Sequence, residues 1–137
     1  MKTKVNLIAV FDKAEQNILF CLRRKDPFKG KFNFVGGKIG QNEDHLSAAY
    51  RELFEETGIE KTDISLFHVM DIIYYGTDTL LEVYAGTLNK DKHVTGEENK
   101  LFWLPVDENF ADERFAGQGN ISHILAQIKT YKLSAIS

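Results

Sequence analysis

Apolar residues occur in short runs along much of the chain, and these runs predict β-strands. β-branched and aromatic residues are concentrated in residues 5–11, 17–22, 64–75, 79–88 and 101–104. Polar residues 12–16 separate the first two runs, and Gly76, Thr77 and Asp78 form a hairpin-type turn between the 64–75 and 79–88 runs. The pattern therefore predicts strands that are joined in part by tight polar turns.

One segment in the middle of the chain has the periodicity of an amphipathic helix. Four apolar positions recur at helical spacing and predict its buried stripe: Leu46, Ala49, Tyr50 and Leu53. Ahead of them, Asn42, Glu43 and Asp44 predict a turn, an N-cap and an acidic first turn. Gly58 predicts the end of the helix, because glycine readily adopts the left-handed conformation found after a helix C-terminus.

A second amphipathic helix is predicted near the C-terminus. Its apolar positions are Ile121, Ile124, Leu125, Ile128 and Tyr131. Hairpin-linked strands mixed with two helices predict an α+β fold, in which a mixed β-sheet lies between helices.

Composition adds limits to this picture. With 137 residues, 43% of them hydrophobic, the chain has the size of one globular domain, which we expect to span residues 1–137. A net charge of -3 gives no global basic field for binding nucleic acid or anionic lipid. We expect a cytoplasmic protein, since no segment is apolar enough to be a signal peptide or a membrane span. Cys21 is predicted to be a core residue.

Acidic residues are concentrated between residues 43 and 60, where six of them accompany the single basic residue Arg51. Glu52, Glu55 and Glu56 are spaced i, i+3, i+4, so on a helix they project within an arc of about 100°. Like charges so placed destabilise a bare helix, which suggests a bound cation, and carboxylate oxygens favour Mg²⁺ or Mn²⁺. The alternative is a solvated acidic face, which is common on helices.

The spacing of residues 37–59 favours the metal. Gly37, five residues, Glu43, seven residues and then the run RELFEETGI match the Nudix box, G-x5-E-x7-R-E-U-x-E-E-x-G-U, at every specified position. The chain resembles the Nudix hydrolases. This resemblance implies a single Nudix domain with an α/β/α sandwich fold and metal-dependent hydrolysis of a phosphoanhydride bond.

The resemblance also implies roles for individual residues. Arg51 should pair with Glu43 and brace the loop against the helix. The metal should be held by Glu55, Glu56 and the Gly36 carbonyl, while Glu52 should be either a further ligand or the base that activates water. Glu98 looks like the loop glutamate that many members contribute as a ligand or base; Glu97 is the alternative, and a solvated loop pair is the simpler explanation.

A basic stretch precedes the box. It contains Arg23, Arg24, Lys25, Lys29 and Lys31 against one acid, Asp26. Taken alone it predicts a solvated loop. Arg23 directly follows a predicted strand, and the family often has a basic residue there, so we expect Arg23 to bind substrate phosphate.

Within the family, residues 32–38 look most like the MutT-type nucleoside triphosphate pyrophosphohydrolases, including those that act on oxidised purine nucleotides such as 8-oxo-dGTP. The expected substrate contacts are Arg23, Asn33, Phe34, Gly37, Lys38, Gln118 and Asn120. Asn33 would read a base edge, although an Asn before glycines is as often a turn former. Phe32 or Phe34 would stack on the base, and an N-cap role competes for Asn120.

Other functions stay open. Tyr74 and Tyr75 lie roughly where dinucleoside polyphosphate hydrolases of this family carry a tyrosine, although strand tyrosines usually pack. Hydrolysis of other nucleoside diphosphate derivatives, or of capped or triphosphorylated RNA, is a further alternative, as is a non-catalytic nucleotide-sensing or RNA-binding module. We expect a small nucleotide substrate, a monomer or homodimer, and neither a membrane nor a stable nucleic-acid partner.

Overall fold

The computed structural model describes residues 2–136, with side chains described as far as Tyr131. The elements follow one another as β1 (Thr3–Phe11), β2 (Asn17–Leu22), β3 (Phe32–Asn33), α1 (His45–Thr57), β4 (Phe67–Tyr74), β5 (Thr79–Thr87), β6 (Lys100–Pro105) and α2 (Asn120–Ile136). The two predicted helices and five predicted strand runs are present, and β3 is additional. No helix within residues 2–136 is long and apolar enough to cross a membrane.

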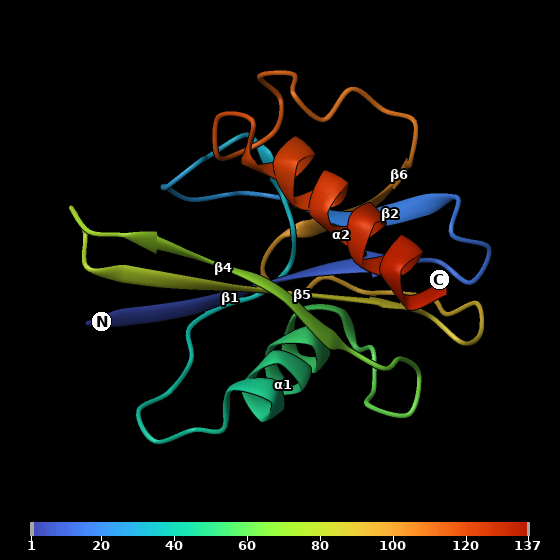
Figure 1. Ribbon diagram of the computed structural model, residues 1–137, viewed down its shortest axis with the longest axis horizontal. Coiled ribbons are helices and arrows are strands. Elements are labelled where there is room, and N and C mark those ends of the chain that lie inside the picture. The colour runs from blue at the N-terminus through green and yellow to red at the C-terminus, as the bar shows by residue number, and fades with distance from the viewer. Residues whose placement is uncertain (1, 137) are drawn as a thin grey trace.

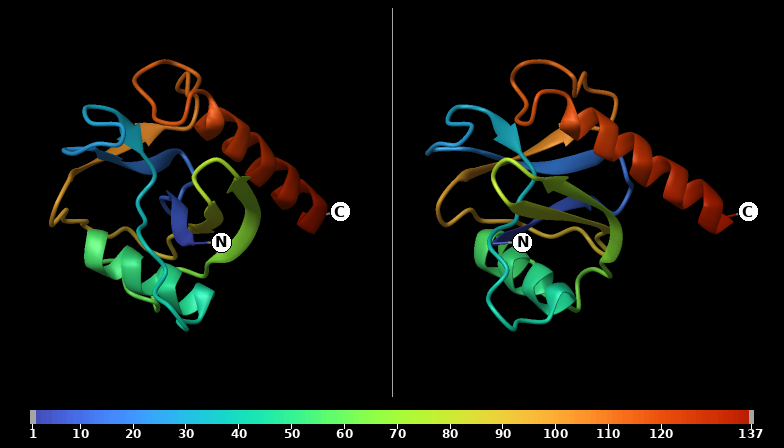
Figure 2. Two further views of the ribbon diagram at one scale, coloured as in Figure 1. Left: turned by 90° about the vertical axis from the view of Figure 1, so that its left-hand side faces the viewer. Right: turned by 60° about the vertical axis from the view of Figure 1, so that its left-hand side comes forward.

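The strands form one mixed sheet. Its order is β3-β2-β1-β5-β4, and β6 pairs with β2 along the full length of both strands. β1 and β5 are parallel, with Thr3 opposite Thr79 and Phe11 opposite Thr87, whereas the other strand pairs are antiparallel. Figures 1 and 2 show α1 and α2 on opposite faces of this sheet, as the predicted sandwich requires.

Alternation along β1 supplies both hydrophobic cores. Ile8 and Val10 face α1, where they belong to the same buried cluster as Leu53. Ala9 and Phe11 face α2 and pack in a second buried cluster with Ile124. Because successive strand residues point to opposite faces, one strand anchors both helices.

The ends of α1 explain where the box lies. Asp44 is the N-cap, and its carboxylate accepts the backbone N–H of Ser47. The predicted N-cap is therefore present, but the predicted acidic first turn is not, because no acid lies in the first turn of α1. At the other end Gly58 adopts φ 79° and closes the helix as predicted. Leu46 is 43% exposed, so its place in the buried stripe was predicted wrongly.

β3 has only two residues, yet it directs the chain toward the box. After it, Val35 and Lys38 form isolated bridges with Ile8 and Val5 of β1. Gly36 and Gly37, which lie between these two bridges, are thereby held against β1.

Cys21 lies on β2 and is a core residue, as predicted. Its side chain belongs to the cluster under α1, and burial, with a smaller contribution from the Glu56 carboxylate, raises the pKa of the thiol to about 11.

Candidate active site

The glycine loop is held to β1 through Asn6. The backbone N–H of Asn6 donates to the Gly37 carbonyl at 2.8 Å, and the Asn6 side-chain Oδ1 accepts the Gly37 N–H at 3.0 Å. A Cβ at Gly36, where φ is 150°, would overlap the Asn6 carbonyl, and one at Gly37 would overlap the Glu52 carboxylate. Gly36 therefore needs glycine because backbone atoms occupy the space, whereas a side chain at Gly37 would have to displace the Glu52 carboxylate.

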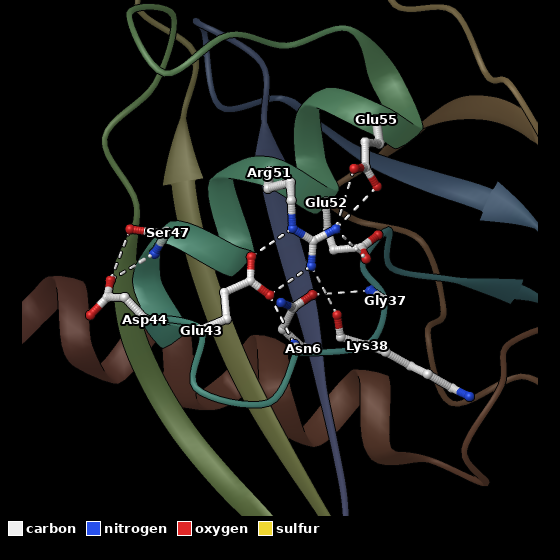
Figure 3. A network of polar contacts seen from close by, with 10 residues as sticks. Asn6, Gly37, Lys38, Glu43, Asp44, Ser47, Arg51, Glu52 and Glu55 are labelled. Carbon is white, nitrogen blue, oxygen red and sulfur yellow. Dashed lines mark hydrogen bonds and ion pairs between the residues drawn. The ribbon is translucent and has the colours of Figure 1, made fainter.

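Arg51 is the centre of the polar network drawn in Figure 3. Its Nε donates to Glu43 Oε2 at 2.6 Å and its Nη2 to Glu43 Oε1 at 2.9 Å, which is a bidentate pair. Nη2 also reaches the Lys38 carbonyl at 3.1 Å, so Arg51 ties the loop to the helix. This confirms the expected pairing with Glu43, and the hydrogen bonds from Arg51 lower the pKa of Glu43 to about 2.

Arg51 also contacts two acids of the predicted metal site. Its Nη1 donates to Glu52 Oε1 at 3.0 Å and to Glu55 Oε2 at 3.2 Å. As Figure 3 shows, the carboxylates of Glu43, Glu52 and Glu55 surround the guanidinium, whereas the side chain of Lys38 extends away from it. One arginine thus compensates the charge of three acids only in part.

Glu56 lies outside this network and carries the clearest electrostatic signal. Burial, followed by the nearby carboxylates of Glu52 and Glu98, raises the pKa of Glu56 to about 7, while Arg23 acts in the opposite direction. Burial also raises the pKa of Glu52, against the effect of Arg51. The surroundings of Glu56 therefore carry more negative charge than the nearby Arg23 offsets.

This donor set fits a divalent cation by its chemistry. Carboxylate oxygens in excess negative charge are the ligands that hard cations prefer, and the absence of a Cβ at Gly37 lets Glu52 lie against the loop. Across residues 2–136, however, no three His, Cys, Asp or Glu side chains are already gathered so that they could hold a metal. Glu52 and Glu55 instead form ion pairs with Arg51.

Arg23 and Glu98 approach the box from two neighbouring loops. Arg23 is half-buried, and its Nε donates to the Pro27 carbonyl at 3.3 Å. Glu98 is exposed, with its carboxylate 3.9 Å from Lys25 Nζ. Their effects on the pKa of Glu56 indicate that both charges lie near this carboxylate. Glu97 is exposed as well.

The two aromatic candidates for base stacking differ in burial. Phe34 is 2% exposed and stacks on Phe20 at 5.1 Å between ring centroids, so it offers no face to a ligand and its prediction as a substrate contact needs correction. Phe32 is half-buried, and its ring contacts those of Phe102 and Phe115, so only its remaining exposed part could meet a ligand. Asn33 is also half-buried at the end of β3, and its Oδ1 accepts the N–H of the next residue, Phe34, at 2.9 Å.

The segment before α2 runs beside β3. The Ala116 N–H donates to the Phe32 carbonyl at 2.8 Å, which brings the stretch that leads to Gln118 and Asn120 alongside Phe32. Gln118 is exposed. Asn120 is the first residue of α2, and its side-chain amide donates to the Tyr74 hydroxyl at 2.8 Å. The residues around Phe32, Gln118 and Asn120 form a second group of predicted substrate residues, the first being Arg23 and the residues of the box. Tyr74 belongs to this second group through its contact with Asn120.

Sequence reasoning missed Asn6, whose two hydrogen bonds hold Gly37. Asn6 is 1% exposed, and it occupies an inward-facing position between the apolar residues Val5 and Leu7. A lone amide at the buried phase of an apolar strand is the signal that could have revealed it, because buried polar side chains need partners.

Comparison with known protein families decides the family. The family described as the NUDIX domain matches residues 1–125, which include every residue of the network around Arg51. The chain belongs to the Nudix family. It is therefore a Nudix hydrolase of the pyrophosphohydrolase class, and such hydrolases generally use divalent metals.

Two curated Nudix hydrolases are similar in sequence. An RNA pyrophosphohydrolase from Pelagibacter ubique is 33% identical over 124 residues, covering 85% of this chain and 68% of that protein. The oxidized purine nucleoside triphosphate hydrolase of Mus musculus is 27% identical over 103 residues, covering 71% of this chain and 64% of that protein. The chain thus spans about two thirds of the length of each.

Solved Nudix structures share the fold. A Caenorhabditis elegans Ap4A hydrolase superposes with a TM-score of 0.76 at 17% identity and covers 95% of this chain and 98% of its own. A MutT protein from Methanosarcina mazei gives 0.73 at 15% identity, covering 95% of both chains. At these identities the likeness establishes the architecture, and the α+β sandwich predicted from the sequence is confirmed.

Proposed function

We propose that this Nudix hydrolase cleaves a nucleoside triphosphate, with oxidised purine nucleotides among its substrates, to a nucleoside monophosphate and pyrophosphate. The observation that carries the proposal is the geometry of the loop and the helix: Arg51 ties the glycine loop to α1, and the Glu52 carboxylate lies against Gly37. The charges of Glu52 and Glu98 also raise the pKa of the neighbouring Glu56. Mg²⁺ or Mn²⁺ is the proposed metal, because oxygen ligands favour hard cations.

The proposed chemistry is the attack of water on a phosphorus atom of the triphosphate. A phosphorus–oxygen bond to water forms while a bridging bond breaks, and pyrophosphate leaves. Glu56, Glu55 and the Gly36 carbonyl are the proposed ligands; the water proton passes to Glu52 or Glu98, whichever does not serve as a ligand. When bound, the divalent cation would supply acidification of water and compensation of the phosphate charge.

Positive charge supports a polyphosphate substrate. Arg23 acts on the same Glu56 carboxylate as the acidic groups do, so a phosphate near this carboxylate would also lie near a guanidinium. Arg51 is committed to three acids, and we assign it to bracing the loop on the helix. Lys38 and Gly37 lie on the loop that Arg51 ties to α1, and Gly37 lies against the Glu52 carboxylate.

The proposed base pocket lies on the second group of residues, Phe32, Asn33, Gln118, Asn120 and Tyr74. The side-chain NH2 of Asn120 donates to the Tyr74 hydroxyl, so the side-chain Oδ1 of Asn120 can accept a hydrogen bond from a base edge. The mouse relative is named for its action on oxidized purine nucleoside triphosphates, which is consistent with a purine in this pocket.

A panel of substrates tests the proposal. Release of phosphate and pyrophosphate would be measured from ordinary and oxidised nucleoside triphosphates, dinucleoside polyphosphates, ADP-ribose and nucleotide sugars, with Mg²⁺, with Mn²⁺ and with chelator. We expect one triphosphate to be cleaved fastest and chelator to abolish the reaction. Preference for a dinucleoside polyphosphate would overturn the substrate assignment. Binding of nucleotide and metal without turnover would instead indicate a sensing module.

Asn33 provides a sharper test of the pocket. If Asn33 reads a base edge, Asn33→Ala should change kcat/KM ratios among bases more than ratios among phosphate chain lengths. A uniform loss across all bases would instead limit Asn33 to its local contact with the Phe34 N–H.

RNA bearing a 5′-triphosphate is the second candidate substrate. Five basic residues occupy the loop after β2, and Phe28 at the same loop is 41% exposed, a combination that suits single-stranded nucleic acid. One relative is named an RNA pyrophosphohydrolase. A short triphosphorylated RNA added to the panel discriminates between the two, since its kcat/KM should fall steeply with salt if the loop binds several phosphates.

A further inference from the structure

Glu98 lies in an exposed stretch that is fixed at one point. Residues 95–98 and Lys100 are exposed, whereas Asn99 between them is only 8% exposed. A buried amide within an exposed loop needs partners, because an unpaired polar side chain away from water is costly. The partners of Asn99 therefore determine where its neighbour Glu98 is held.

Arg24 forms two hydrogen bonds with this stretch. Its backbone N–H donates to the Asn99 side-chain Oδ1 at 3.0 Å, and its Nη1 donates to the Glu98 carbonyl at 3.0 Å. We call these contacts of Arg24 with Glu98 and Asn99 the joint. It lies next to the end of the β2–β6 pairing, where Leu22 is opposite Lys100. Gly96 packs on the same turn, since a Cβ there would overlap the Asn99 carbonyl. Side-chain and backbone contacts thus fix the residues on both sides of the joint.

The joint connects two loops that carry charged residues of the proposed site. Arg23 directly precedes Arg24, and Glu98 directly precedes Asn99, so the hydrogen bonds of Arg24 with Glu98 and Asn99 link the two loops. A change in the joint would therefore shift the Arg23 loop and the Glu98 loop relative to each other and to the box.

We propose that Asn99 is a positioning residue, which, through its hydrogen bond to Arg24, holds Glu98 in the place from which it acts in hydrolysis. This rests on the proposed function, in which Glu98 is a ligand or base. Small misplacements of a reacting group are costly: about 1 Å can reduce the rate on the order of 100-fold. Asn99 itself needs no contact with substrate or metal.

The competing explanation is that Asn99 only stabilises its loop. Both explanations allow Asn99→Ala to lower stability, so stability alone cannot separate them. They differ in whether the effect of Asn99 on kcat depends on the Glu98 carboxylate. A double-mutant cycle measures this dependence directly.

The experiment determines kcat, KM and Tm for wild type, Asn99→Ala, Glu98→Ala and the double variant, at saturating Mg²⁺ and well below each Tm. We expect Asn99→Ala to lower kcat about 10-fold or more with a small change in KM, and to add less than about 2-fold in the Glu98→Ala background. Asn99→Asp, which keeps an acceptor for the Arg24 N–H, should stay within about 3-fold of wild type.

Asn89→Ala is the matched control. Asn89 anchors the other end of the same connection, where its side-chain amide donates to the Thr62 carbonyl at 2.8 Å. It should lower Tm without the coupling to Glu98. Equal losses of kcat from Asn99→Ala with and without Glu98 would overturn the proposal, and so would an unchanged kcat in Asn99→Ala or Glu98→Ala. Activity lost in Glu56→Gln would still support the proposed function, so the two failures are distinguishable.

Discussion

Two carboxylates of this protein, Asp63 and Glu56, have opposite electrostatic surroundings. The Asp63 side chain is 1% exposed, with Lys92 Nζ at 2.5 Å and Lys90 Nζ at 3.4 Å. The hydrogen bond from Lys92 is the main cause that lowers the pKa of Asp63 to about 2. Burial and neighbouring acids instead raise the pKa of Glu56 to about 7.

The difference separates an acid with a structural role from one that we propose to be functional. Asp63 has positive partners in excess, and its second role is to accept the Glu60 N–H at 2.8 Å, so it fastens loops together. Glu56 is placed where the chain supplies too little positive charge, which costs stability unless a cation arrives. Perturbed carboxylates with unmet charge are typical of catalytic and metal sites.

The largest expected effect is a loss of kcat when Glu56 or its neighbour Glu55 is changed. Glu56→Gln and Glu55→Gln should each lower kcat by at least about 100-fold, because each removes negative charge that would bind the metal. In the metal-free protein at pH 8, Glu56→Gln should keep or raise Tm, since it removes a charge that burial disfavours. Steady-state kinetics and thermal unfolding check the two parts. Unchanged kcat would exclude both residues as ligands.

For Asp63 the expectation is the opposite: a substitution should lower Tm and leave kcat unchanged. Asp63→Asn should lower Tm, because it removes the ion pairs of a buried carboxylate and leaves Lys92 without its partner. Its kcat, measured well below the new Tm, should equal that of wild type. A loss of kcat without a loss of Tm would contradict the structural role.

The pH dependence of unfolding sharpens the same contrast. The pKa of Asp63 is lowered in the folded state, so its ionised form stabilises the protein fully above about pH 4, its unfolded value, and this contribution disappears as pH falls toward about 2. Denaturant titrations of wild type and Asp63→Asn should therefore converge over this range. A constant difference between the two proteins at all pH values would refute the assignment.

The smallest effect is expected from the two lysines compared with each other. The Lys92 side chain is 23% exposed and Lys90 is 64% exposed at a longer distance from Asp63. Exposed ion pairs contribute little, so Lys90→Ala should change Tm barely, whereas Lys92→Ala should lower it clearly. Equal Tm values for both variants would show that the short Lys92 contact adds nothing.

Much of the architecture followed from local pattern. Gly58 ends α1 as its position predicts, and both helices and both strands of the β4–β5 hairpin appear near their expected places. β3 could not be predicted, because a two-residue strand depends on pairing with Cys21 and Leu22 of β2 and not on its own periodicity. Leu46 followed the helical period but lies toward solvent, since the period alone does not define the edge of the buried stripe.

In the candidate site, too, contacts within one local motif could be predicted, whereas contacts between distant parts of the sequence could not. The Glu43–Arg51 pair was predictable because both residues belong to one motif at fixed spacing. The contacts of Asn6 with Gly37 and of Arg24 with Asn99 join positions 31 and 75 residues apart, and no local pattern encodes them. Phe34 was misassigned because the local sequence does not show which way an aromatic side chain beside a glycine loop faces. In the structure it faces Phe20 and not a ligand.

The buried thiol of β2 gives the protein an internal reporter of its own opening. Cys21 is the only cysteine in the sequence, it is 3% exposed, and its high pKa leaves little thiolate at neutral pH. An alkylating reagent should therefore modify the chain only when β2 leaves the sheet, at a rate set by that fluctuation. The rate of Cys21 alkylation would then report how nucleotide and metal change the frequency of this opening, without the introduction of any probe.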